Sequence, residues 1–279
     1  MPPGGSERLS SVPAAPAPRN TRRWSRIAAD IGQPVAALII FVVLWELICR
    51  FFNVPAYLVP APSAIWTDTL KLIGPVSVHT LATTQTVLLG FLASLIVSLP
   101  LAILITASPA IANTIYPLLV LTQSIPKVAL APILVVIFGS NELPRVVVTF
   151  LVAFFPLVLS IAAGITAVPP ELIELGRACK ASYWRALWRI RLPYAVPFIF
   201  SGLKAAITLS VVGAVVGEFV NADKGLGYLI VTSTAFFQVP LAWGALVLLS
   251  LMGIILFQAV VIVEQVFFPW AVDADKQAV

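Results

Sequence analysis

Residues 80–106 read TLATTQTVLLGFLASLIVSLPLAILIT, a run of 27 residues that contains no charged side chain. An α-helix rises about 1.5 Å per residue, so about 20 apolar residues cross the ~30 Å hydrocarbon core of a bilayer. Residues 146–168 and 241–263 form two further uncharged runs of 23 residues each. Each of these three runs predicts a helix that spans a membrane.

The composition of the whole chain excludes a soluble globular protein. Apolar residues make up 60% of the 279 residues and charged residues 10%, whereas soluble domains have about 45–50% and about 25%. The mean hydropathy is +1.02. The 17 basic and 12 acidic side chains are too few to cover the surface of a soluble protein of this length. We therefore expect an all-α polytopic membrane protein.

Six spanning segments can be drawn along the chain, at residues 31–52, 80–106, 111–139, 146–168, 194–220 and 241–267. Residues 1–28 are rich in Pro, Ala and Arg and lack a signal-peptide pattern, so they are predicted to form a disordered cytosolic tail. The spans and their loops then form one transmembrane domain over 29–269, and 270–279 form a short C-terminal tail.

Lysine and arginine residues are distributed unevenly between the two sides of the predicted spans. Three lie in the loops of one side, at Lys71, Arg145 and Lys224. Eleven lie on the other side: Arg8, Arg19, Arg22, Arg23, Arg26, Arg177, Lys180, Arg185, Arg189, Arg191 and Lys276. Because loops rich in Lys and Arg stay in the cytosol, both termini are predicted to be cytosolic.

Prolines and polar side chains interrupt two of the predicted spans. The third contains Pro117, Pro126 and Pro132, and proline removes a backbone donor and breaks or kinks a helix. Non-helical backbone at membrane depth is tolerated where protein or water meets it, so this span is predicted to be a broken helix that lines a path; a purely structural kink is the alternative. The candidate path residues in the third and fifth spans are Gln123, Ser124, Pro126, Lys127, Lys204 and Glu218. For the two lysines, a structural ion pair or an ammonium that snorkels to the interface remains open.

The loop 169–193 reads PPELIELGRACKASYWRALWRIRLP and is the one long loop on the predicted cytosolic side. Pro170 suits the first position of a helix, and Glu171 and Glu174 lie in the turn where the helix dipole favours negative charge. Ser182 is predicted to cap a second short helix, and Pro193 to end it. Residue types alone leave open a basic amphipathic segment that lies on anionic headgroups.

The spacing within this loop resembles the EAA loop of ABC-importer permeases. Glu174 stands at the first position of that motif, and Leu175 and Gly176 stand where the family has two alanines. The spacing to the end of the motif is intact. Lys180 replaces the glycine of the family pattern. The residues that the resemblance assigns to coupling with an ATPase are Glu171, Glu174, Arg177, Lys180, Ala181, Ser182, Trp184, Ile190, Leu192 and Pro193.

The resemblance is to the permeases of the nitrate, sulfonate and taurine importer group, and it covers roughly residues 35–268. Residues 125–132, IPKVALAP, are similar to the third-span signature of that group, and 201–204, SGLK, to its Gly-Leu-Arg element. Glu218 followed by 225–230, GLGYLI, is similar to its outer-loop element. The blocks occur in the same order as in the family.

The resemblance implies a MetI-like permease fold of type I ABC importers, in the bacterial inner membrane. It implies a second permease subunit, either a copy of this chain or a related chain in a pseudo-symmetric heterodimer, together with two ATPase subunits and an extracytoplasmic binding protein. The solute would be a small anion, such as a sulfonate, taurine or nitrate, or a small heterocyclic or aromatic compound. ATP and Mg would bind to the partner ATPase, and no cofactor to this chain, which has no G-x-x-x-x-G-K-[ST] motif.

Two other classes of function are less consistent with the sequence than a permease. A secondary transporter or channel would work without an ATPase, but transporters often show inverted repeats, and none is visible here. An intramembrane enzyme would need a catalytic constellation, and no HExxH or GxSxG occurs. His79 is the single histidine, so no His-based metal site is expected. Cys49 and Cys179 fall on opposite sides of the membrane in the predicted topology, so no disulfide between them is expected.

The departure at Lys180 leads to a conformational prediction. Glycine adopts a positive φ at no steric cost, whereas a lysine forced into that region loses about 1–2 kcal/mol. We therefore expect ordinary φ values around Lys180 and Ala181, with Ser182 capping the helix that follows.

Overall fold

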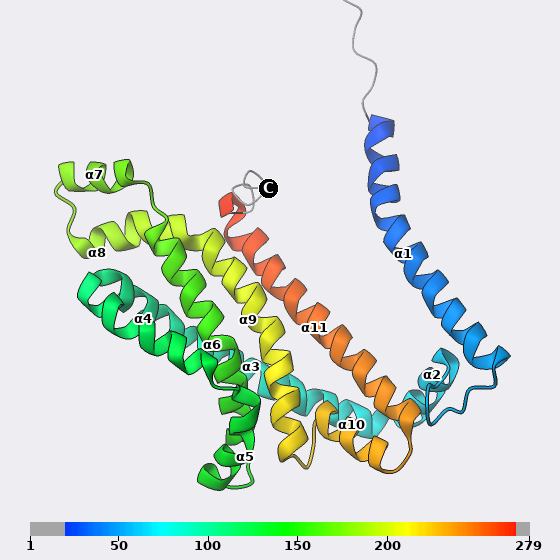
Figure 1. The fold of residues 1–279 in the computed structure, drawn as a ribbon. Coiled ribbons are helices and arrows are strands. Elements are labelled where there is room, and N and C mark those ends of the chain that lie inside the picture. Colours follow the sequence, from blue (N-terminus) through cyan, green and yellow to red (C-terminus); the bar gives the residue numbers. More distant parts are fainter. Residues whose placement is uncertain (1–19, 272–279) are drawn as a thin grey trace, which may run out of the picture. The chain divides into compact units, whose positions relative to one another are not determined.

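The computed structural model describes residues 20–271, with side chains from residue 32 onward except that of residue 34. Every regular element within this range is a helix (Figure 1), which confirms the predicted all-α class. The chain divides into two compact units, residues 1–54 and residues 55–279.

The first unit contains one helix, α1 (Asn20–Phe51). It includes the first predicted span, and it begins at Asn20 rather than near residue 29, so residues 20–28 are helical and not disordered as predicted. Adding a residue to an existing helix costs far less than starting one, which favours this extension. The remainder of the predicted tail, residues 1–19, lies outside the described residues. Arg50 Nε donates to Glu46 Oε1 one turn away, as expected for this pair.

Four helices of the second unit are long and apolar enough to span a membrane, as far as the described residues were searched. They are α3 (Ile73–Ala107), α6 (Leu143–Thr166), α11 (Val239–Phe267) and a continuous helix Tyr183–Val220. The continuous helix consists of α8 (Tyr183–Ala186), a π-helical turn η1 (Leu187–Arg191) and α9 (Leu192–Val220).

The predicted third span is broken, as expected. It consists of α4 (Pro109–Ser124) and α5 (Lys127–Phe138), which are bent by 90° relative to each other. Ile125, between them, has φ −75° and ψ 123°, because a residue that precedes proline avoids the helical region. Counted as one span, the pair brings the number in the second unit to five.

The core of the second unit is the contact between α3, α6 and α9. Small residues let these helices approach closely, as is typical of helix packing in membranes. A Cβ on Gly202 would lie 2.6 Å from Ser160 Cβ, and a Cβ on Gly213 would lie 2.8 Å from the Cα of Thr149. Buried aliphatic side chains fill the space around these contacts, including Val87, Leu157, Ile161 and Ile207.

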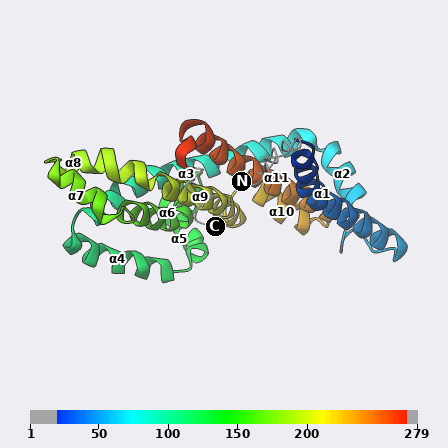
Figure 2. The same ribbon diagram turned by 90° about the horizontal axis from the view of Figure 1, so that it is seen from above.

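Short helices lie at both ends of this core. α7 (Pro170–Ala178) forms a hairpin with α8 and η1, whereas α10 (Leu226–Ala235) follows the C-terminal end of α9. Both views place the hairpin and α10 at opposite ends of the second unit (Figure 1, Figure 2). α2 (Pro62–Lys71) packs against α11.

Candidate functional site

The two helices predicted in the loop 169–193 are present, with the predicted starting residues. Pro170 is the first residue of α7, and Glu171 lies in its first turn. Ser182 is the N-cap of α8, where its Oγ accepts a hydrogen bond from the N–H of Arg185 at 3.4 Å. Arg191 stacks over the ring of Tyr183 at 5.9 Å, which joins η1 to the start of α8.

Gly176 and Ile190 hold the two arms of the hairpin together. A Cβ on Gly176 would lie 2.9 Å from Ile190 Cδ1, so the small residue allows α7 to approach η1. Gly176 stands where the family has alanine, and Ile190 is also part of the motif. The contact therefore gives a physical reason for a small residue and an aliphatic residue at this spacing.

The prediction of ordinary φ values at Lys180 is wrong, because Lys180 has a φ of 53°. The N–H of Lys180 donates to the carbonyl of Arg177 at 2.9 Å, and the N–H of Ala181 donates to that of Gly176 at 2.9 Å. This pair of bonds is the Schellman motif, which closes a helix end with one left-handed residue. The hydrogen bonds to free carbonyls of α7 outweigh the cost of a left-handed lysine, so the turn keeps the geometry that glycine would adopt.

Pro193 does not end the second loop helix, contrary to the prediction, since the helix continues through η1 into α9. In the π-helical turn the N–H of Leu192 bonds to the carbonyl of Leu187, five residues back. A π-turn shifts the hydrogen-bond ladder, and Pro193, which has no N–H to donate, lies directly after this turn at the start of α9. The hairpin is therefore a direct extension of a spanning helix.

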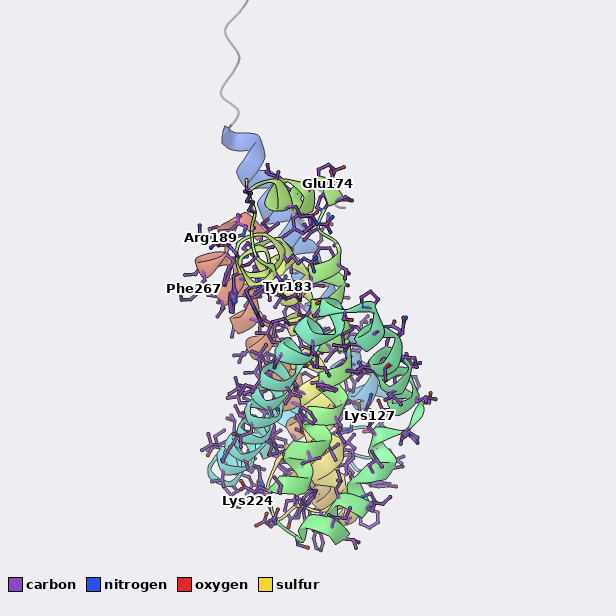
Figure 3. All side chains as sticks on the ribbon, turned by 90° about the vertical axis from the view of Figure 1, so that its left-hand side faces the viewer. Lys127, Glu174, Tyr183, Arg189, Lys224 and Phe267 are labelled. Atoms are coloured by element: carbon purple, nitrogen blue, oxygen red, sulfur yellow. The ribbon has the colours of Figure 1, made fainter. Side chains whose placement is uncertain are left out.

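The hairpin exposes large apolar side chains together with acidic ones. Leu175, Trp184 and Trp188 are 61%, 62% and 64% exposed, and Glu171 and Glu174 are exposed beside them on α7. Exposed apolar groups rimmed by charge are typical of a protein-docking surface. Figure 3 shows Glu174, Tyr183 and Arg189 at the same end of the second unit as Phe267, with Lys224 at the opposite end.

The remaining loop residues of the predicted site divide by exposure. Arg177, Lys180, Ser182 and Pro193 are exposed, whereas Ala181, Ile190 and Leu192 are partly buried. The exposed set is available to a partner, and the partly buried set shapes the hairpin.

The candidate path residues of the third span lie at the 90° bend. Gln123, Ser124 and Pro126 are exposed on this chain, and Lys127 is half-buried. The ammonium of Lys127 lies 5.9 Å from the centre of the Phe155 ring on α6. Figure 3 places Lys127 part-way between the two ends of the second unit, so the bend presents polar groups at mid-depth of the helices.

Lys204 and Glu218 both have partners within the chain and lie apart from each other. Lys204 Nζ on α9 is 2.7 Å from Glu264 Oε2 on α11. The sequence reasoning missed Glu264 because this residue follows directly after the uncharged run 241–263, where it looks like a helix end. Glu218 is 2% exposed, and its Oε2 accepts the N–H of Gly227 at 2.7 Å. Fourteen helical residues separate the two positions by about 21 Å.

A polar cavity of about 330 Å³ lies at the α10 end, and Arg145, Asp223 and Lys224 are among the residues that line it. Among the described residues, no group of three or more His, Cys, Asp or Glu side chains could hold a metal ion.

Comparison with known proteins agrees with this geometry. Residues 98–270 match the family model of the binding-protein-dependent transport system inner membrane component. The chain belongs to this family. It is an inner-membrane permease subunit of an ABC importer for small solutes, and the family implies a separate ATPase and a binding protein as partners.

Two relatives and one solved structure illustrate the range of similarity to this permease. The formylaminopyrimidine transport permease protein of Halalkalibacterium halodurans is 32% identical over 239 residues, which are 85% of this chain and 95% of the relative. The taurine transport system permease protein of Escherichia coli is 22% identical, over 89% of this chain and 92% of the relative. A chain of the MetNI methionine ABC transporter in an inward-facing conformation matches with a TM-score of 0.53 at 17% identity, covering 68% of this chain and 98% of that chain. The last match shows that the fold is the predicted MetI-like fold.

Proposed function

We propose that this permease works as a homodimer with two ATPase subunits and an extracytoplasmic binding protein. One chain offers only four or five spans in its second unit, which is too narrow a wall to enclose a path. The face of α5 supports a second copy, because Val136 and Ile137 are 86% and 65% exposed on this chain. The solute path would then lie between the two copies, beside the bends of their third spans.

The α7–α8 hairpin is proposed to be the EAA loop that receives the ATPase. The observation that carries this proposal is the exposed apolar and acidic surface on a hairpin that continues directly into a spanning helix. Closure of two ATPase subunits around ATP and Mg would displace the hairpin, and the helix Tyr183–Val220 would carry that displacement into the membrane. The chain itself supplies the path and the lever, and the ATPase supplies the free energy of hydrolysis.

Charge reversal at Glu174 tests the docking proposal. We expect Glu174→Arg to lower the amount of ATPase that co-purifies with the permease, since it places a positive charge in the acidic part of the docking surface. Glu142→Arg, at an exposed carboxylate on the opposite end, is the matched control and should leave co-purification unchanged. Equal recovery of ATPase with both variants would contradict the proposal. Wild-type protein that transports solute with no ATPase present would support a secondary transporter or channel instead.

The path is proposed to run past the bend that contains Gln123, Ser124, Pro126 and Lys127. Lys204 and Glu218 were also candidate path residues, but Lys204 is paired with Glu264, and Glu218 bonds to the backbone of α10. These partners favour structural roles for both. Lys127 is thus left as the better candidate for an electrostatic contact with a passing anion.

The solute is proposed to be a small anion or a small heterocyclic compound that the binding protein delivers. Relatives with names for formylaminopyrimidine and riboflavin support a heterocycle, and relatives with names for taurine, aliphatic sulfonates and nitrate support an anion. Stimulation of ATP hydrolysis in the reconstituted complex, across a panel of both classes, distinguishes them. Uptake that is unchanged by Lys127→Met would exclude a role for this charge in anion passage.

A further inference from the structure

The N-terminus of α10 is capped by side chains from two other helices. The first N–H groups of a helix have no partner inside the helix and need one elsewhere. Here three consecutive groups are satisfied by residues that α3 and α9 supply. The three bonds join Gly225 N–H to His79 Nδ1 at 3.1 Å, Leu226 N–H to Thr83 Oγ1 at 2.7 Å, and Gly227 N–H to Glu218 Oε2 at 2.7 Å.

Glu218 supplies a side-chain oxygen to this cap, and its Oε2 accepts the N–H of Gly227. Breaking a buried hydrogen bond leaves a donor without a partner, which destabilises the folded chain. Oε1 of the same side chain is buried and has no hydrogen-bond partner among the described residues, so the bond from Gly227 to Oε2 compensates the burial of this group. The cap therefore ties α10 to the outer end of α9 by a bond that is costly to break.

Two glycines make room for the Glu218 carboxylate. Gly225 has a φ of 129°, and a Cβ at this position would fall on the carboxylate itself. A Cβ on Gly227 would lie 2.9 Å from both Cβ and Oε2 of Glu218. The local sequence is thus shaped around one side chain of α9.

Arg145 on α6 holds the same loop from the other side. It is 4% exposed, and its Nη1 donates to the carbonyl of Lys224 at 2.9 Å. The turn before α10 is therefore fixed to α6 as well as to α3 and α9. α10 and the turn before it cannot move away from α3, α6 and α9 without leaving several buried polar groups unsatisfied.

We propose that Glu218 is a positioning residue that makes α10 move with α9 as one rigid body, so that displacement of the α7–α8 hairpin reaches the far surface. The helix Tyr183–Val220 runs from the hairpin to within a few residues of the cap, which places both ends on one rod. α10 is then part of the moving body and not an independent lid. This inference rests on the proposed coupling to an ATPase.

Amide hydrogen exchange on the purified full-length chain tests the cap by itself. In Glu218→Ala we expect the Gly227 N–H to exchange at least about tenfold faster than in wild type, the ratio that a loss of about 1.4 kcal/mol gives. Glu218→Gln keeps an oxygen acceptor at the same place and should stay close to wild type. Glu142→Ala removes an exposed carboxylate at the same end and is the control. Unchanged exchange in Glu218→Ala would overturn the inference.

Distances in the complex with the ATPase test the transmission. Two samples are prepared, one with a spin label at Tyr194→Cys on the inner end of α9 and one with a label at Thr234→Cys on α10. Both carry Cys49→Ala and Cys179→Ser, so that no other cysteine is labelled. In each sample the distance between the labels on the two permease copies is measured with and without Mg-ATP and vanadate. In wild type both distances should change. In Glu218→Ala only the α9 distance should change, and solute uptake per ATP hydrolysed should fall at least about fivefold, the lower end of the range for coupled sites.

The outcomes separate the inference from the proposed function. A change at α10 that persists in Glu218→Ala overturns the inference alone. Glu218→Gln keeps an oxygen acceptor, so the α10 distance should still change in this variant. If the change is lost to the same extent as in Glu218→Ala, the inference is also overturned. A wild-type complex in which neither distance responds to Mg-ATP and vanadate overturns the proposed coupling, and with it the transmission through Glu218. A defect that only lowers the yield of assembled complex, with an unchanged ratio of uptake to hydrolysis, is a structural role and contradicts the proposal.

Discussion

Three residues other than glycine have a positive φ among residues 20–271, and all three close a helix. They are Asn53, Lys180 and Phe237, with φ values of 49°, 53° and 58°. Each donates its N–H to the carbonyl three residues back, and the next residue donates to the carbonyl five residues before it. The same capping motif therefore explains all three, and the identity of the side chain matters less than the free carbonyls at the helix end.

Lys180→Gly should stabilise the hairpin. Relief of the left-handed conformation gains about 1–2 kcal/mol, and the greater freedom of glycine in the unfolded chain takes back about 0.4–1 kcal/mol. We expect a net gain of about 0.5–1 kcal/mol, measured as slower exchange of the Ala181 amide. Lys180→Ala keeps the Cβ and is the control that should show no gain. Slower exchange in both variants would mean that the lysine head group, not φ, causes the strain.

The ion pair of Lys204 and Glu264 should contribute to stability mainly as a matched pair. Glu264 has a side chain only 4% exposed, and removal of one partner of a buried pair typically costs about 3–5 kcal/mol. We expect Lys204→Met to lower the thermal unfolding temperature in detergent clearly, and Lys204→Met with Glu264→Leu to recover most of the loss. Lys71→Met breaks an exposed pair with Asp68 and should have almost no effect. A double variant no more stable than the single one would contradict this account.

At the scale of elements, the chain contains many prolines within helices but one sharp break. Pro117 and Pro132 lie inside α4 and α5, and Pro100, Pro156 and Pro197 lie inside α3, α6 and α9. Only the Ile125–Pro126 step leaves the helical region among the third-span prolines, with a 90° bend. Membrane helices tolerate proline where other groups can satisfy the freed carbonyls, so the local effect of proline does not by itself decide where a helix breaks.

Pro126→Ala should loosen the bend, because Ile125 is then free to adopt helical φ and ψ. The expected result is a longer and broader distance between spin labels at Thr114 on α4 and Val136 on α5. Pro132→Ala, inside α5, is the matched control and should leave that distance unchanged. An unchanged distance in Pro126→Ala would show that packing against α6, rather than the proline, holds the bend.

At the scale of the whole molecule, the hairpin and the end of α11 lie at one end of the second unit, and Lys224 lies at the other (Figure 3). The basic residues of the loop 169–193 gather at the hairpin end, as expected for the cytosolic side of a membrane protein. This arrangement supports cytosolic termini, which remain a prediction.

Labelling of cysteines in intact cells checks this orientation. Cys179 is free and exposed on the hairpin, so a membrane-impermeant maleimide should label it only after the membrane is made permeable. Asp223→Cys on a Cys179→Ser background should be labelled in intact cells. Labelling of Cys179 from outside would reverse the assigned orientation.

The membrane class, the broken third span and the starts of the two hairpin helices could be predicted from the sequence alone. The thickness of the bilayer sets the length of an uncharged run, so the spans can be recognised from composition alone. Pro170 and Ser182 act on the backbone close to them in the sequence, so the helix starts depend only on local residues. The spacing of the hairpin motif also pointed to the family. The left-handed turn at Lys180 was missed because the cost of a lysine was weighed without the helix-end bonds that compensate it.

The roles of the charged residues in the spans depend on how the helices pack against one another. Lys204 and Glu264 are far apart in the sequence and meet because α9 packs on α11. Glu218 looked like a peripheral residue or one that lines the path, yet it caps α10 together with two residues of α3. The partner of a buried charge depends on which helices lie side by side. Which helices pack together depends on close contacts of small residues between spans. Hydropathy and spacing along the sequence do not predict these contacts.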